Sequence, residues 1–111
     1  MGSYNVIISP NALAQLDSYI SYIRSTLLNP IAAERMWRDA LDTRNQLSNV
    51  AGSLKLCDDP DLKRLGYHVI DFTKHKYVML YRVDGGTAFV DAIYHQMQDY
   101  EHIFVTSISL E

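Results

Sequence analysis

The chain has 111 residues, a formal net charge of −3, 48% hydrophobic residues and 21% charged residues, a balance typical of one ordinary globular domain. No apolar run approaches the length of a membrane-spanning helix, and no secretory signal is visible. The single cysteine, Cys57, excludes an internal disulfide and favours a reducing, cytoplasmic location. We treat residues 1–111 as one domain without membrane association, although Met1-Gly2-Ser3 is typical of a residual cloning sequence.

Charge is unevenly distributed along the chain. Residues 62–82 carry a net charge of +4, whereas residues 83–111 carry −5. The cations of the basic stretch are Lys63, Arg64, Lys74, Lys76 and Arg82. One interpretation is a basic face for an anionic partner, and the other is chance on a short chain. The acidic total argues against strong non-specific binding to nucleic acid.

The first half of the chain predicts a strand and a helix. Tyr4 to Ser9 is rich in β-branched and aromatic residues, and Ser9-Pro10 has the N-cap and first-turn proline of a helix. Apolar residues then recur at spacings of three and four, which predicts a helix of about five turns that ends at Asn29-Pro30. The predicted apolar stripe is Leu13, Leu16, Ile20, Ile23 and Leu27.

A second helix is predicted from near Pro30 to near Gly52, which is a suitable helix stop. Its apolar stripe is predicted to be Ala33, Met36 or Trp37, Ala40, Leu41, Leu47 and Val50. The short break between the helices predicts an antiparallel hairpin. Residues 53–66 are polar at their centre and are expected to form a loop.

Three strands are predicted in the second half, at residues 67–73, 77–83 and 87–94, with Asp84-Gly85-Gly86 as a hairpin turn. These strands are too apolar to be exposed, and the helical hairpin is the element available to cover them. The expected fold is therefore α+β, a small and mostly antiparallel sheet packed under an antiparallel two-helix hairpin. A short helix is expected from Gln98 through Phe104, and residues 105–110 alternate like a further strand.

Four segments, in this order, carry a resemblance to a known family. They are residues 7–12 (IISPNA), 65–68 (LGYH), 77–84 (YVMLYRVD) and 93–101 (IYHQMQDYE). Together they resemble the RelE/ParE superfamily of toxins from bacterial type II toxin–antitoxin modules, over residues 4–104. The resemblance implies a cytoplasmic, growth-inhibiting toxin that a cognate antitoxin neutralises by folding its tail across the toxin surface.

Membership of this superfamily would be compatible with either of two cellular targets. RelE-like members cleave mRNA on the ribosome, and ParE-like members inhibit DNA gyrase. RelE-like relatives carry cations where this chain has His68 and Met97, and residues 76–83 (KYVMLYRV) resemble the ParE branch more closely. Gyrase inhibition is therefore slightly favoured. The alternatives are a RelE-like, metal-independent mRNA endonuclease and a non-toxic family member that acts only as an interaction protein.

The endonuclease alternative needs a base, an acid and cations that stabilise the reacting phosphate. His68 and His95, expected on neighbouring strands, would exchange protons near neutral pH. The candidate catalytic residues are His68, Arg82, His95 and Tyr100, and the candidate phosphate- or substrate-binding residues are Lys74, Lys76 and Tyr94. The tyrosines would orient or stack a base. The competing interpretation is structural, with surface imidazoles and Arg82 paired to Asp84 or Asp91.

Other sites carry less support. His95, Asp99 and His102 share one face of a helix but lack a fourth zinc ligand, so we expect neither metal nor cofactor. Cys57 is a lone cysteine in a polar loop, which is rarely a nucleophile. The expected partners are a cognate antitoxin and either DNA gyrase or the ribosome with mRNA, and a homodimer is a further expectation. The eight tyrosines fit a protein–protein contact surface.

Overall fold

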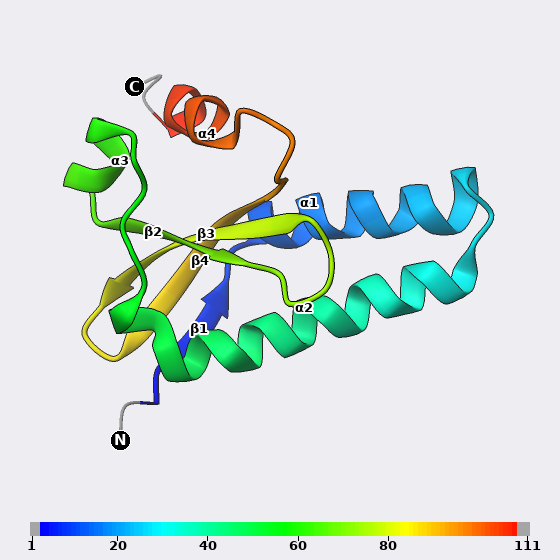
Figure 1. Ribbon diagram of the computed structural model, residues 1–111, viewed down its shortest axis with the longest axis horizontal. Helices are drawn as coiled ribbons and strands as arrows, with labels where there is room; N and C mark the ends of the chain where they lie inside the picture. The colour runs from blue at the N-terminus through cyan, green and yellow to red at the C-terminus, as the bar shows by residue number, and fades with distance from the viewer. Residues whose placement is uncertain (1–2, 109–111) are drawn as a thin grey trace.

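The computed structural model describes residues 3–108 and shows two long helices beside a four-stranded sheet (Figure 1). The elements are β1 (Asn5–Ile8), α1 (Pro10–Ser21), the π-helical turn η1 (Tyr22–Thr26), α2 (Pro30–Val50), the 3₁₀ turn η2 (Ala51–Ser53), α3 (Pro60–Arg64), β2 (Tyr67–Asp71), β3 (Tyr77–Asp84), β4 (Thr87–His95) and α4 (Tyr100–Ile108). The predicted α+β class is confirmed.

The sheet has the strand order β1-β4-β3-β2. β1 runs parallel to β4, whereas the β4–β3 and β3–β2 pairs are antiparallel, as the mostly antiparallel prediction requires. β3 and β4 are joined through Gly85-Gly86, and Gly85 has a φ of 62°, which glycine adopts without steric cost. Leu80 pairs with Ala92 and Tyr81 with Val90, so Asp91 is the extra residue of a β-bulge.

Helices α1 and α2 form the predicted antiparallel hairpin and cover one face of the sheet. The Ser9 side chain caps α1 by accepting from the backbone N–H of Ala12, and Asn29 caps α2 through the N–H of Ala32. The main core contains Ala12, Leu16, Ile20, Ala33, Met36, Ala40, Leu47, Ala51, Ile70, Phe72, Met79, Tyr81, Ala88, Val90 and Ile93. Met36 is the residue that turns inward, and Trp37 remains 43% exposed.

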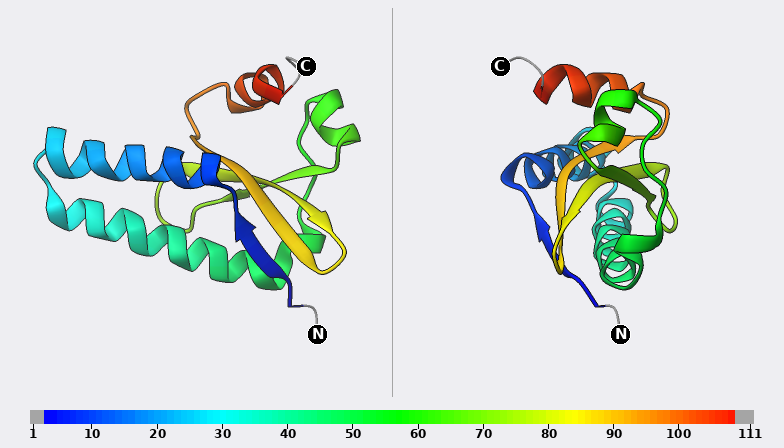
Figure 2. Two further views of the ribbon diagram at one scale, coloured as in Figure 1. Left: turned by 180° about the vertical axis from the view of Figure 1, so that it is seen from behind. Right: turned by 90° about the vertical axis from the view of Figure 1, so that its left-hand side faces the viewer.

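The opposite face of the sheet has a second, smaller core. It contains Cys57, Leu62, Tyr67, Val78, Leu80, Ala92, Tyr94 and Phe104. Leu62 comes from α3 and Phe104 from α4, and Figure 2 shows these two short helices together at the end of the molecule away from α2. The expectation that the hairpin alone covers the sheet was therefore incomplete.

Two segments are helical in the structure where the sequence predicted a loop and a strand. Within the predicted loop 53–66, Asp59 accepts hydrogen bonds from the N–H groups of Asp61 and Leu62, and this N-cap starts α3. Residues 105–108 continue α4 instead of forming a strand, because Phe104, Val105 and Ile108 share a helical face against the second core. Residues 109 and 110 of that predicted strand lie outside the described residues.

Gly52 lies just past the end of α2, as predicted, but for a different reason. It has no positive φ, so it does not form the left-handed cap that glycine usually provides. A side chain at this position would instead overlap the ring and hydroxyl of Tyr4, which precedes β1. None of the helices in residues 3–108 combines the length and apolar character needed to cross a bilayer.

Candidate functional site

The two histidines singled out from the sequence lie far apart in the sheet. His68 is on β2 and His95 ends β4, and β3 lies between these strands. The prediction of neighbouring strands is therefore wrong. Because His68 pairs with Tyr81 and His95 with Tyr77, about 13 Å of β3 also separates them along the strand direction. The fold does not bring the proposed acid and base to one phosphate group.

His68 is held by packing and by a backbone contact. Its Nδ1 lies 2.8 Å from the carbonyl oxygen of Leu54, so this nitrogen carries the proton and donates. The imidazole also stacks on the ring of Tyr81, with centroids 5.1 Å apart and planes 15° apart. Tyr81 is itself buried and donates its hydroxyl to the carbonyl of Ala51. These contacts give His68 a role in fastening residues 51–54 to the sheet.

Arg82 points to the other face of the sheet and already has a partner. Its Nε donates to Oδ2 of Asp91 at 3.2 Å, and its guanidinium lies 4.6 Å from the ring centroid of Phe89. The Tyr67 hydroxyl donates to the same Asp91 oxygen at 2.7 Å. Partial burial opposes the charged form, but the charge of Asp91 raises the pKa of Arg82. The structure thus shows the Asp91 ion pair that was the competing interpretation.

The candidate aromatic residues are enclosed to different degrees. Tyr94 is only 6% exposed in the second core, so its ring offers no face for a base, and burial raises its pKa. Tyr100 begins α4, is partly buried against the same core, and also has a pKa raised by burial. Burial, followed by the nearby Glu101 carboxylate, raises the pKa of Cys57 to about 12. The Cys57 thiol is therefore neutral and shielded from solvent.

Three of the candidate residues lie at the same end of the sheet. Lys74 and Lys76 are exposed in the loop between β2 and β3. The carbonyl of Lys76 accepts from the N–H of Gln96, directly after His95. The rings of His95 and Tyr77 pack in a T-shaped arrangement with their centroids 4.9 Å apart. The chain therefore gathers Lys74, Lys76 and His95 at one end, away from His68 and Arg82. Among residues 3–108, no three His, Cys, Asp or Glu side chains gather in a metal-binding group.

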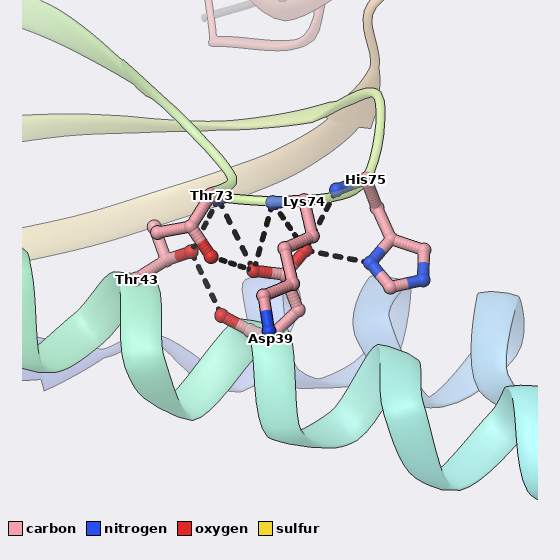
Figure 3. Close-up of polar contacts among 5 residues, drawn as sticks. All are labelled: Asp39, Thr43, Thr73, Lys74 and His75. Atoms are coloured by element: carbon pink, nitrogen blue, oxygen red, sulfur yellow. Dashed lines mark hydrogen bonds and ion pairs between the residues drawn. The ribbon is translucent and has the colours of Figure 1, made fainter.

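Asp39 organises this end of the molecule and was missed from the sequence (Figure 3). The side chain is 1% exposed and accepts from the backbone N–H groups of Thr73, Lys74 and His75. It also accepts from the Thr73 hydroxyl and lies 2.6 Å from Nδ1 of His75. Burial opposes its ionisation, but these hydrogen bonds lower the pKa of Asp39 below its ordinary value.

A signal for this network was present in the sequence. Asp39 and Thr43 are four residues apart and interrupt the apolar stripe of α2, so both polar side chains had to be buried on the core-facing side. The Thr43 hydroxyl donates to the carbonyl of Asp39 at 2.8 Å and lies 3.3 Å from the N–H of Thr73. A buried carboxylate requires donors. The sequence does not reveal that these donors belong to the β2–β3 loop.

The helical hairpin exposes apolar side chains that the periodicity had placed in the core. Leu13 is 45% exposed, and the hairpin turn adds Tyr22, Leu27, Leu28 and Ile31 to the exposed large hydrophobic residues. A groove of about 400 Å³ runs between α1 and α2. It is lined by Leu13, Leu16, Asp17, Ile20, Arg24, Ala33, Glu34 and Trp37. An apolar groove with charged margins is the form of a site that takes an amphipathic peptide.

Comparisons with known proteins agree with this architecture. The sequence profile of a family described as the ParE toxin of the type II toxin-antitoxin system, parDE, matches residues 6–100. A solved structure titled "Chromosomal ParDE TA system from P. aeruginosa" superposes with a TM-score of 0.70. It shares 18% sequence identity, and the match covers 86% of this chain and 98% of that chain. Comparison with curated protein sequences gives no significant match.

Proposed function

Because the chain belongs to the ParE toxin family of type II toxin–antitoxin systems, we propose that it arrests growth by binding DNA gyrase and that a cognate antitoxin blocks this binding. The observation that carries the proposal is the dispersal of the groups that RNA cleavage needs. A binding mechanism requires a complementary surface and no converging acid and base, so it is compatible with this arrangement.

The geometry of the ionisable groups supports binding over RNA cleavage. General acid–base catalysis needs both groups within hydrogen-bond reach of the reacting atoms. His68 and His95 are separated by β3, and Arg82 lies on the opposite face in its ion pair with Asp91. A phosphate bound by any one of these residues is therefore out of reach of the other two. Inhibition of gyrase by binding does not require an acid and a base at one phosphate group.

The hairpin groove supports the second half of the proposal. Leu13 and Trp37 lie on either side of it, and both are too exposed to serve the core of the free protein. Leu28, in the adjoining turn, is 79% exposed and has a φ of 53°, which is strained for a leucine. Exposed apolar groups and local strain concentrate at binding surfaces. We assign this surface to the antitoxin.

The experiment that tests the target is a supercoiling assay with purified DNA gyrase, run beside a ribosome-dependent mRNA cleavage assay. We expect loss of supercoiling and intact mRNA. The His68→Ala and His95→Ala variants should inhibit gyrase as the unmodified chain does. Cleaved mRNA that disappears in both variants would refute the proposal in favour of the endonuclease. Activity in neither assay, with a folded protein, would refute it in favour of an interaction-only protein.

The antitoxin surface is tested by affinity measurements with the protein encoded beside this chain. Truncating Leu13 or Trp37 to Ala removes an apolar anchor, and we expect each change to weaken binding by at least about tenfold. Leu65→Ala is the matched control, because Leu65 is a 54% exposed apolar residue outside the groove. Equal weakening by Leu65→Ala, or no weakening by the groove variants, would place the antitoxin elsewhere.

A further inference from the structure

A second hollow lies where α2 meets the β2–β3 loop, and none of the α2 residues that line it also lines the antitoxin groove. Its volume is about 490 Å³, and it is lined by Arg35, Arg38, Asp39, Asp42, Lys74 and His75. We propose that this hollow, which we call the loop pocket, binds a phosphate group of a nucleotide or of nucleic acid. The proposal is independent of the gyrase assignment.

Two separate parts of the chain bring the cations together. Arg35 and Arg38 are three residues apart on one face of α2, and Lys74 comes from the β2–β3 loop. Among the residues that the structure describes, Arg35 and Lys74 form no ion pair within 4.0 Å. Arg38 pairs only with Glu34, and both side chains are exposed, so water competes strongly with that pair. The cationic groups are therefore available to a ligand.

Asp39 lines the pocket, and its carboxylate reduces the positive charge there, but its oxygens are occupied by donors from the protein. Its two oxygens accept from the Thr73 and His75 side chains and from three backbone N–H groups, which fills the lone pairs of a carboxylate. Only 1% of the residue is exposed, so an incoming anion does not meet these oxygens. Asp39 instead fixes the loop, and a fixed loop presents Lys74 and His75 without an ordering cost on binding.

His75 adds a polar group whose direction is set by Asp39. Its Nδ1 is directed at Asp39, and Figure 3 shows the second ring nitrogen pointing away from the carboxylate. That Nε2 atom can accept from a protonated phosphate oxygen, or can donate to phosphate when the ring is charged. Arginine guanidinium groups suit phosphate because their forked N–H groups match two of its oxygens. The set of donors thus fits phosphate better than an uncharged ligand.

Asp42 is the exposed acidic group of the pocket, where an incoming anion would meet it. It is exposed on the same face of α2, one turn from Arg38 and Asp39, and lies at the margin of the pocket. Its negative charge lowers the local affinity for phosphate. Replacing it with the uncharged and similarly shaped asparagine should therefore strengthen binding. This increase is a more specific sign of the pocket than any loss of binding.

The test is titration calorimetry of the full chain with inorganic pyrophosphate and, separately, with a short DNA duplex. We expect Arg35→Gln and Lys74→Gln each to weaken binding by about tenfold, since each removes a charge-assisted contact. Asp42→Asn should tighten it. The matched controls are Arg44→Gln on the same helix and Lys63→Gln in α3, because neither residue lines the pocket. Both should bind as the unmodified chain does.

The outcomes separate the sources of the phosphate from a failure of the proposal. Binding of pyrophosphate without the duplex supports a free nucleotide, and binding of both supports a nucleic-acid backbone, provided that the pocket variants weaken it. Absence of binding to either ligand overturns the proposal. Equal weakening by the control variants also overturns it, because the effect would then follow net charge. The substituted side chains are exposed, so unchanged thermal unfolding should confirm that each variant is folded.

Discussion

At the scale of single residues, Asp39 joins α2 to the β2–β3 loop through a buried carboxylate. It is one of the two buried polar or charged residues recorded in residues 3–108, and Thr43 is the other. The β2–β3 loop is fastened to α2 through its carboxylate, since Thr73, Lys74 and His75 all donate to it. The position of Lys74 in the loop pocket therefore depends on a residue that a phosphate ligand never touches.

Asp39→Asn should lower the free energy of unfolding by about 2 kcal/mol at neutral pH, since hydrogen bonds to a charged group contribute about 1.5–3 kcal/mol each and the amide retains part of them. Urea unfolding measures the change. Asp42→Asn is the matched control on the same helix face, and its exposed side chain should give almost no change. Equal effects in the two variants would contradict the anchoring role.

The pH dependence of stability follows from the lowered pKa of Asp39. Its folded-state pKa is below the ordinary value of 3.8, so the ionised form stabilises the fold. That contribution is complete above the unfolded-state pKa and disappears as pH falls through the folded-state pKa. The stability difference between the unmodified chain and Asp39→Asn should therefore shrink below about pH 4. If this stability difference instead grew as the pH fell, the pKa of Asp39 would not be lowered by folding.

At the scale of elements, the hairpin turn ends the first helix of the hairpin, and the β-bulge in β4 connects that strand to the start of α1. Leu27 donates to the carbonyl of Tyr22, five residues earlier, in a wide turn that ends the first helix of the hairpin. In β4, the extra residue at the bulge leaves the carbonyl of Asp91 to accept from the side chains of Ser9 and Asn11. The bulge therefore anchors the start of α1 as well as turning the Asp91 carboxylate toward Arg82.

Leu28→Asn should stabilise the free protein while weakening antitoxin binding. Asparagine tolerates the left-handed conformation better than leucine, and the exposed leucine side chain loses little packing, so we expect a gain of about 0.5–1 kcal/mol. Urea unfolding and antitoxin affinity are measured on the same sample. A loss of stability would show that Leu28 packs in solution. Unchanged affinity for the antitoxin would show that the hairpin turn does not contact it.

At the scale of the whole molecule, the sheet is stabilised by a core on each face. The second core depends on α4, because Phe104 is 2% exposed and meets the Tyr67 ring edge-on with centroids 5.0 Å apart. Glu101 also ties α4 to the start of α3 by accepting from the N–H groups of Asp58 and Asp59. Helix α4 is therefore part of the folded domain.

Phe104→Ala should cost about 3–5 kcal/mol of unfolding free energy, as expected for truncation of a buried aromatic side chain. The adjacent Ile103→Ala is the matched control, because Ile103 is 39% exposed and should cost much less. Chemical denaturation and protease resistance are the two measurements. A small effect of Phe104→Ala would mean that α4 is dispensable and that the hairpin side alone stabilises the sheet.

The amino-acid sequence by itself determined the local structure and the family. The spacing of apolar residues, the Ser9-Pro10 and Asn29-Pro30 caps and the Gly85-Gly86 turn are contacts between near neighbours, so the order of helices and strands followed from them. Two short elements were misjudged. The N-cap of α3 went unrecognised, and residues 105–108 alternate as a strand would, although they continue the predicted helix and pack against the second core.

The tertiary structure alone decided which residues share a surface. The strand order separates His68 from His95, and the sheet places Arg82 on the opposite face from His68. The packing of α2 beside the β2–β3 loop also places Arg35 and Lys74, which are distant in the chain, in the lining of one pocket. The local spacing of apolar residues predicts which side chains face a core, but not which distant element packs against them. The site therefore required the fold, because its contacts join residues that share no local pattern.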